Sequence, residues 1–279
     1  MVSDLFSMNT MILRTTIGGI LLVIITGMLA LGVHPIPEYQ SDPIVSGLDH
    51  IPVVVVDLAS AAESYRKLGF TLKPGREHEN GIQNLHIKFA DGTEIELITA
   101  NKAADPLTTE YIRLLTIGEG AAFVGFYSSD LDQLATRFSD NGRHYDIDGG
   151  LLTFPRSTPL RYIFFGQRIK SPTDTPKHFE HQNGAEALIG VWIAGENLES
   201  ERQLFSELDI EIHEDQVHSP DRMIAEIAQL PQAEVILLPG SSQLLPGRKI
   251  IGATLRTQNL EALQAILNKN SWSMPPIVQ

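Results

Sequence analysis

"GLDHIPVVVVDLASAAESYRKLGF", residues 47–70, carries the pattern that decides the fold. Isoleucine and valine dominate residues 51–56, which is typical of a buried β-strand. Asp57 then provides a helix N-cap, because its carboxylate can accept hydrogen bonds from the free amides of a first helical turn. Gly69 suits the left-handed residue that ends such a helix. The stretch predicts a strand followed by a helix, with His50 as the polar residue at the head of the strand.

The same unit recurs along the chain. Three further copies occur, at residues 123–131, 189–198 and 251–260. Each ends in an N-cap residue followed by leucine, at Asp130, Asn197 and Asn259. The first two copies leave room for three more strands each, the third is less regular, and the fourth breaks off in residues 271–279. We predict an α+β fold of repeated βαβββ modules in two paired-module halves, with the last module incomplete.

The repeats also predict the domain boundaries. These are a hydrophobic leader at 1–34, a linker at 35–46, paired modules 1 and 2 at 47–170, a second linker at 171–184, and degenerate modules 3 and 4 at 185–279.

The leader predicts a location outside the cytoplasm. Residues 15–33 carry no charge, and a helix of this length is about long enough to cross a bilayer. Arg14 precedes this run and no lysine or arginine follows it closely, so the rest of the chain should lie on the outer side. Small residues at Ala30 and Gly32 equally fit a cleaved signal peptide. We expect either a membrane anchor, through an uncleaved N-terminal helix, or export to the periplasm.

Composition excludes several classes of function. The net charge of −13 argues against binding to nucleic acid or to an anionic membrane surface. The absence of cysteine excludes disulfides and thiolate metal sites. A small-molecule partner remains the simplest expectation.

Two pieces of sequence together carry a family resemblance. They are residues 47–70 and "DGTEIELI" at residues 91–98. The chain resembles the vicinal oxygen chelate superfamily, which includes glyoxalases, bleomycin-resistance proteins and extradiol dioxygenases, and within it the glyoxalase-like domain proteins. The resemblance covers residues 47–168 well and residues 185–268 in outline. It implies paired modules whose mixed sheets curl around a cleft, with metal ligands, where present, on the first and last strands of those modules.

Strand alternation indicates which side chains share that cleft. In "NLHIKF" and "TEIELI" the apolar residues should face the helix, so His86, Lys88, Glu94 and Glu96 face the other way. A three-residue "ADG" turn pairs Lys88 with Glu94 and His86 with Glu96. The same alternation points His50 into the concavity.

The resemblance implies that His50 and Glu96 occupy ligand positions. With His86 they would form a set of two imidazoles and one carboxylate, which suits divalent Fe, Mn, Zn or Ni. His86 or Glu96 would move the proton as the catalytic residue. The implied reaction is that of a metal-dependent lyase, isomerase or dioxygenase acting on a small oxygenated organic substrate. The alternative for these residues is a satisfied polar network without metal.

Substrate-binding positions are predicted around this set. They are Gln83, Asn84, Lys88, Phe123 and Arg161. Two other functions stay open beside the metal-dependent enzyme. One is a metal-free small-molecule binding protein of the bleomycin-resistance type, and the other is a non-catalytic assembly module that forms a homodimer through an open sheet edge.

Two histidines in the second linker are weaker candidates. His178 and His181 are three residues apart, beside an "NGA" sequence near which relatives often carry a histidine. We expect a solvated linker here rather than a loop at the rim of the cleft.

Overall fold

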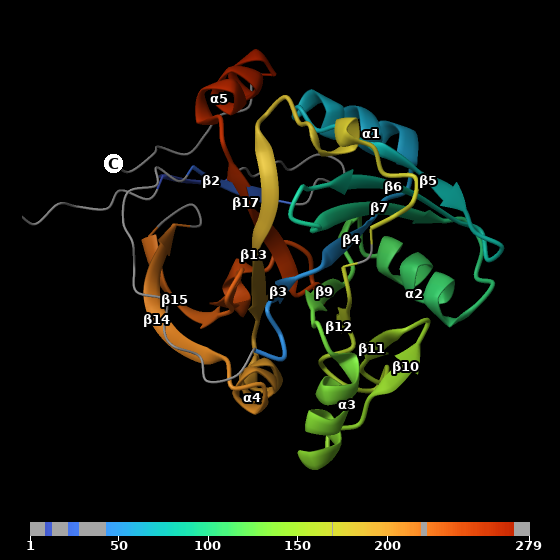
Figure 1. The fold of residues 1–279 in the computed structure, drawn as a ribbon, viewed down its shortest axis with the longest axis vertical. Coiled ribbons are helices and arrows are strands. Elements are labelled where there is room, and N and C mark those ends of the chain that lie inside the picture. The colour runs from blue at the N-terminus through green and yellow to red at the C-terminus, as the bar shows by residue number, and fades with distance from the viewer. Residues whose placement is uncertain (1–8, 13–21, 28–42, 169, 219–221, 271–279) are drawn as a thin grey trace, which may run out of the picture.

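The structure, a computed structural model, describes residues 9–12, 22–27, 43–168, 170–218 and 222–270. These residues form an α+β fold with five α-helices and three mixed β-sheets, two of five strands and one of seven. In Figure 1 the two five-stranded sheets lie on the right, and the strands of the seven-stranded sheet lie in the centre and on the left.

Module 1 has the predicted βαβββ order. Its elements are β4 (His50–Val54), α1 (Leu58–Lys67), β5 (Lys73–Glu77), β6 (Ile82–Lys88) and β7 (Glu94–Ala100). Strand β4 runs parallel to β7, and β6 is antiparallel to both β5 and β7. The hydrophobic residues Ile51, Val53 and Val55 are fully buried in the main core, as expected for the helix-facing side.

Module 2 repeats this order. Its elements are β9 (Val124–Tyr127), α3 (Leu131–Asp140), β10 (Asp146–Asp148), β11 (Leu151–Thr153) and β12 (Ile163–Gly166). The two modules exchange short strands: β3 (Gly47–Leu48) pairs with β9, and β8 (Gly120–Ala121) pairs with β4. The chain passes between the two sheets at Asp49, directly before His50. This exchange brings His50 to the junction of the modules.

The second half supplies five of the strands of the seven-stranded sheet, and β1 (Asn9–Ile12) and β2 (Leu22–Gly27) from the N-terminal residues supply the other two. The elements of the second half are β13 (Ala185–Gly195), α4 (Glu199–Glu207), β14 (Glu211–His218), β15 (Arg222–Gln229), β16 (Glu234–Pro239), β17 (Ile250–Thr257) and α5 (Leu260–Lys269). Strand β13 lies between β16, which is parallel to it, and β17, which is antiparallel. Module 3 is therefore more regular than its sequence suggested, and module 4 has only one strand and one helix in residues 250–269. Two short 3₁₀ helices, Pro176–Phe179 and Gly240–Ser242, complete this half.

The structure differs from the predicted N-terminal membrane helix in the part of that segment that it describes. Most of the predicted segment, residues 15–21 and 28–33, lies outside the described residues. The part that is described, Leu22–Gly27, is strand β2, which pairs with β1 (Asn9–Ile12) and runs parallel to β17. Its β-branched residues fit a strand as well as they fit a membrane helix. Among the described residues, none of the helices is long and apolar enough to span a bilayer.

Helix α2 (Pro106–Leu115) belongs to neither module and was not predicted. It connects the two modules and packs into a second hydrophobic cluster with Val54, Ile98, Phe123 and Phe164. These residues lie on the face of the sheets opposite the main core, which is the face that was expected to line the cleft. Helix α2 therefore covers part of that face.

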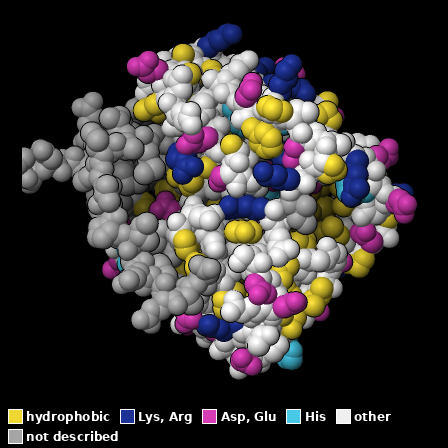
Figure 2. All heavy atoms as spheres, in the orientation of Figure 1, with side chains coloured by type: hydrophobic (Ala, Val, Ile, Leu, Met, Phe, Trp, Pro, Cys, Tyr) yellow, Lys and Arg dark blue, Asp and Glu magenta, His cyan; other side chains and the backbone are white. Residues whose placement is uncertain are grey.

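The surface is mixed in charge. On the face that Figure 2 displays, acidic, basic and hydrophobic side chains are interspersed over the described part of the molecule. The net charge of −13 is therefore not gathered into one acidic patch on this face.

Candidate functional site

A cleft of ≈ 880 Å³ opens beside His50. One wall comes from β5, β6 and the start of β7, which include Asn84, His86, Lys88 and Glu94. Module 2 contributes Leu151 and Gln167, and residues 171–178 of the predicted linker close another side. The cleft therefore combines both modules and the segment that follows them.

His50 is held on both sides by carboxylates. Its Nδ1 lies 2.6 Å from Asp49 Oδ2, and its Nε2 lies 3.8 Å from Glu96 Oε2. Burial by itself would lower the pKa of His50. The hydrogen bond to Asp49 and the charges of Asp49, Glu96 and Glu94 outweigh burial, so that the pKa rises to about 9. At neutral pH this side chain is an imidazolium whose Nδ1–H donates to Asp49.

Glu96 is held by Asn84. The Asn84 amide donates to Glu96 Oε1 over 2.6 Å, while its Oδ1 accepts from the backbone N–H of Arg76 over 3.0 Å. Gly75 lies against the same amide, and a Cβ at this position would clash with the Asn84 side chain and backbone. Asn84 is thus fixed by its neighbours on β5, and it fixes Glu96 in turn.

The predicted pairing of β6 with β7 is confirmed. His86 lies opposite Glu96 and Lys88 opposite Glu94, and the turn has Gly92 in the left-handed region at φ 91°. The predicted Lys88–Glu94 ion pair is present, with Nζ 3.1 Å from Oε2.

The imidazole of His86, however, reaches diagonally to Glu94 and not to Glu96, with Nδ1 3.1 Å from Oε1. Burial alone would raise the pKa of Glu94. The hydrogen bond from His86 and the charges of His50, His86 and Lys88 lower the pKa to about 2.

Lys73 and Asp49, which line the cleft, and Asp174, which contacts its lysines, had no functional prediction. Lys73 and Asp174 are both almost buried and form an ion pair of 2.5 Å, and Asp174 also pairs with Lys88 at 3.3 Å. Asp49 is the partner of His50. The sequence "DH" indicated that Asp49 could be a partner of His50, because the two residues are adjacent. Asp174 could not be found in this way, because it lies far along the chain in a segment without strand or helix periodicity.

The two linker histidines are both ordered against the first half, so the expectation of a solvated linker is wrong. His178 lines the cleft. His181 accepts from the backbone N–H of Thr71 through Nδ1, lies 3.0 Å from the Lys88 carbonyl through Nε2, and packs edge-on against Phe70 and Phe89. Burial lowers the pKa of His181, so it is a neutral structural residue.

Other predicted substrate residues lie outside this cleft. Asn84 and Lys88 line it, whereas Gln83 alternates to the opposite face of β6. Phe123 and Arg161 line a separate pocket beside α2. They lie apart from the cleft because helix α2 packs between the two module sheets in the described structure. The strand patterns of the modules do not reveal this helix.

The donor set does not fit a metal ion. Among the described residues there is no group of three histidine, aspartate or glutamate side chains placed to hold one. His50 Nε2 and Glu96 Oε2 face each other at 3.8 Å, but His86 turns to Glu94 and does not supply a third donor to this pair. On the side of module 2, the ring of Phe164 packs edge-on against His50 with 4.9 Å between centroids. A phenyl ring therefore stands where a paired module would have to supply a further ligand.

Comparisons with known proteins agree with the fold. Residues 48–208, more than half of the chain, match the family model described as a glyoxalase-like domain. A search of curated protein sequences found no significant match.

Several solved structures are similar in fold at low sequence identity. A hypothetical protein from Staphylococcus aureus has a TM-score of 0.52 at 12% identity, covering 76% of this chain and 98% of that one. An extradiol ring-cleaving dioxygenase from B. fuscum has a TM-score of 0.54 at 14% identity, with 82% and 62% covered. A 4-hydroxymandelate synthase variant from Streptomyces coelicolor has a TM-score of 0.52 at 12% identity, with 73% and 65% covered. These likenesses establish the fold alone.

Proposed function

The chain belongs to the family of glyoxalase-like domain proteins, and from this premise we propose that it binds a small oxygenated organic molecule in the cleft beside His50 without a metal ion. The observation that carries the proposal is the environment of His50. This residue is a cation held by Asp49 through Nδ1 and packed against Phe164, so its Nε2–H is arranged to donate a hydrogen bond to a ligand.

The size of the cleft supports a small-molecule ligand. Its ≈ 880 Å³ falls within the range of roughly 300–1,000 Å³ that is common for ligand sites. The apolar part of the cleft wall is formed by Pro74, Leu151 and Pro172. A ligand with a small apolar body and a few oxygen atoms fits these surfaces.

The polar groups support an acceptor on the ligand. His50 Nε2 lies 3.8 Å from Glu96, beyond hydrogen-bonding distance, and it makes no hydrogen bond to another described residue. His78 also lines the cleft, and its buried Nε2 has no partner among the described residues. A carbonyl, hydroxyl or carboxylate oxygen on the ligand would accept from the His50 imidazolium, and His78 could add a second hydrogen bond.

The test is ligand binding with and without the His50 cation. Catechol, mandelate and pyruvate serve as probes in thermal-shift and calorimetric titrations of the full chain in the presence of a chelator. We expect at least one probe to bind, and His50→Gln to weaken it roughly 10- to 100-fold, the effect of losing one charged hydrogen bond. His144→Gln is the matched control, because His144 is exposed and does not line the cleft.

Metal analysis of untagged protein decides between this proposal and the metal-dependent enzyme. We expect less than stoichiometric Fe, Mn, Zn and Ni, and probe binding that added metal does not improve. One metal ion per chain that is lost in both His50→Gln and Glu96→Gln, with the fold retained, would overturn the proposal.

A further inference from the structure

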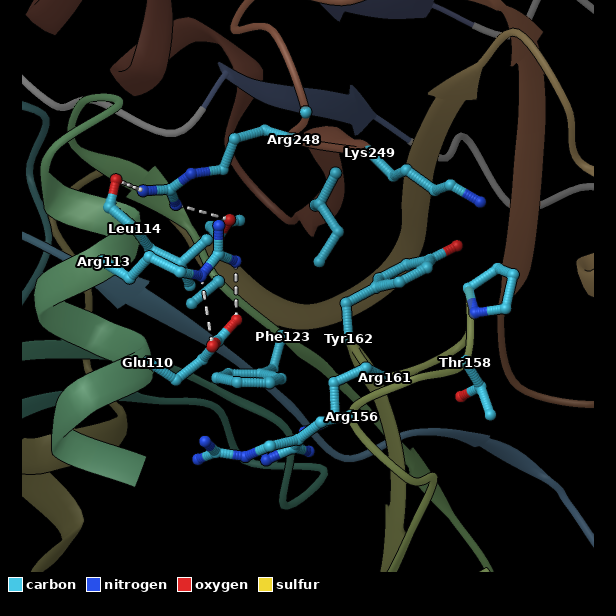
Figure 3. Close-up of a pocket in the computed structure, with 15 residues that line it drawn as sticks. Glu110, Arg113, Leu114, Phe123, Arg156, Thr158, Arg161, Tyr162, Arg248 and Lys249 are labelled. Atoms are coloured by element: carbon cyan, nitrogen blue, oxygen red, sulfur yellow. Dashed lines mark hydrogen bonds and ion pairs between the residues drawn. The ribbon is translucent and has the colours of Figure 1, made fainter. Parts of the chain in front are cut away.

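A second pocket, of ≈ 250 Å³, lies where the two halves of the chain meet. Its walls come from α2, from the segment between β11 and β12, and from residues 247–250 ahead of β17 (Figure 3). It shares no lining residue with the cleft beside His50. Whatever it binds is therefore independent of the function proposed above.

The pocket is basic, although the protein as a whole has a net charge of −13. Five of its lining residues are cationic, namely Arg113, Arg156, Arg161, Arg248 and Lys249. Glu110 is the single acidic residue in the lining. Such a concentration of one charge in a small pocket needs a counter-charge.

Among the described residues, carboxylates form ion pairs with two of these cations. Arg113 pairs with Glu110 at 2.7 Å, and Lys249 pairs with the buried Glu201 at 2.6 Å. Arg248 donates instead to backbone carbonyls, and Arg156 to the carbonyl of Pro106. Carbonyl dipoles satisfy the donors but leave the net charge of these two guanidinium groups in place.

Arg161 has neither kind of partner. Its guanidinium lies over the ring of Phe123, 5.2 Å from the centroid, and makes no hydrogen bond or ion pair with another described residue. In Figure 3 the side chains of Arg156 and Arg161 extend together beside Phe123. Partial burial lowers the pKa of Arg161, and the like charge of Arg156 lowers it further.

Arg248 adds a deeply buried positive charge to the same pocket. It is only 4% exposed, and its Nε is buried without a hydrogen-bond partner among the described residues. Burial and the charge of Arg113 lower its pKa to about 10, with Glu110 opposing them. An anion bound nearby would stabilise both Arg161 and Arg248.

We propose that this pocket binds a small organic anion, whose carboxylate or phosphate group pairs with Arg161 and whose flat apolar body packs against Phe123 and Tyr162. The planar guanidinium can donate two parallel hydrogen bonds to either oxyanion. The volume of ≈ 250 Å³ lies just below the usual range for drug-sized ligands, so the ligand is a compact one.

The test is a ligand-observed NMR titration of the full chain with benzoate, phenyl phosphate and benzyl alcohol. We expect one or both anions to bind, and the neutral alcohol to bind at least about tenfold more weakly. The tighter anion identifies the preferred head group. Binding of the anions should weaken as sodium chloride is added, because salt screens the attraction.

Variants assign the binding to this pocket. Arg161→Gln should weaken anion binding at least about tenfold, and Arg161→Lys, which keeps the charge but not the planar fork, should have an intermediate effect. Arg66→Gln is the matched control, since Arg66 is exposed on α1. His50→Gln should leave anion binding unchanged.

Three results would overturn the proposal: equal binding of benzyl alcohol and benzoate, an equal loss in Arg66→Gln, or no binding of either anion. Circular dichroism confirms the fold of each variant. Because the Arg161 guanidinium makes no hydrogen bond or ion pair with another described residue and loses only its contact with the Phe123 ring, its replacement by glutamine should lower the unfolding temperature only slightly.

Discussion

At the scale of single residues, the protonation of His50 depends on its neighbour in the chain. Asp49 lies at the point where the chain crosses between the two module sheets, and this break in the strand lets adjacent side chains meet at 2.6 Å. Burial would otherwise favour the neutral imidazole. The charge that we assign to the cleft therefore depends mainly on Asp49, with the charges of Glu96 and Glu94 adding to its effect.

Asp49→Asn should lower the pKa of His50 from about 9. The folded-state pKa lies above the ordinary value of 6.5, so the interaction contributes to stability below pH 6.5 and is lost as the pH rises through about 9. The full contribution is roughly 3 kcal/mol at low pH. Asp49→Asn should thus lower the free energy of unfolding near pH 6 and have much less effect above about pH 9.

Urea unfolding at several pH values and NMR titration of the His50 imidazole measure these two effects. Asp132→Asn, on an exposed turn of α3, is the control. A His50 pKa that stays near 9 in Asp49→Asn would contradict the role given to Asp49.

Alternation along the strands was enough to predict which residues face the cleft, but not which ones pair. His50, Asn84, His86 and Lys88 all line it, as their positions in the sequence indicated. The sequence could not predict that His86 pairs with Glu94 and not with Glu96. A side chain on a strand reaches a diagonal neighbour almost as easily as the one directly opposite.

At the scale of elements, the predicted N-caps are the most accurate feature. Asp57, Asp130 and Asn259 each accept a hydrogen bond from the backbone N–H three residues ahead, at 2.6, 2.9 and 2.9 Å. Asn197 accepts from Glu199 instead, and α4 begins one residue later than predicted. Local hydrogen bonding is encoded by a few neighbouring residues, which is why these starts could be predicted from sequence.

Helix α2 was missed although its sequence carries a strong signal. Asp105, Pro106 and Thr108 form a capping box with proline in the first turn. The βαβββ repeat contains no helix between modules, so the fold predicted from the repeat does not include α2. As a result, the cleft was predicted as one continuous hollow containing Phe123 and Arg161.

Asp105→Ala should lower the free energy of unfolding by roughly 0.5–2 kcal/mol, because its side chain accepts from Thr108 N and from the Asn80 amide, both at 2.7 Å. Chemical unfolding followed by circular dichroism measures the loss. Asp132→Ala, in the first turn of α3 and without a side-chain hydrogen bond to described residues, should change stability by less than about 0.5 kcal/mol. Equal effects of the two substitutions would count against the capping box.

At the scale of the whole molecule, the two halves share one hydrophobic core. Phe126 of module 2 packs against Phe205 of α4, and a single buried cluster contains residues from both halves. Polar contacts also cross between them, since Thr93 Oγ1 accepts from Leu188 N at 2.9 Å and Arg143 pairs with Glu207 at 2.5 Å. Separate repeats in the sequence thus do not imply separate folding units.

Arg248 makes the most extensive of these contacts. It comes from the second half and donates to the carbonyls of Leu114, Gly118, Gly120 and Ala121 in the first half. Leu114 lies in the last turn of α2, where a positive charge is also favoured by the helix dipole. No sequence pattern predicted this residue, because its partners are backbone atoms more than a hundred positions away.

Arg248→Ala should therefore destabilise both halves together. Loss of the hydrogen bonds that this buried guanidinium donates to four backbone carbonyls should lower the free energy of unfolding by roughly 3 kcal/mol or more. Both tryptophans, Trp192 and Trp272, belong to the second half of the sequence, so their fluorescence reports on that half, whereas circular dichroism reports on all elements. In urea, we expect the two signals to shift to the same lower midpoint, with Arg66→Ala unchanged. Two separate transitions, with only the fluorescence shifted, would mean that the halves unfold independently and that Arg248 stabilises the second half alone.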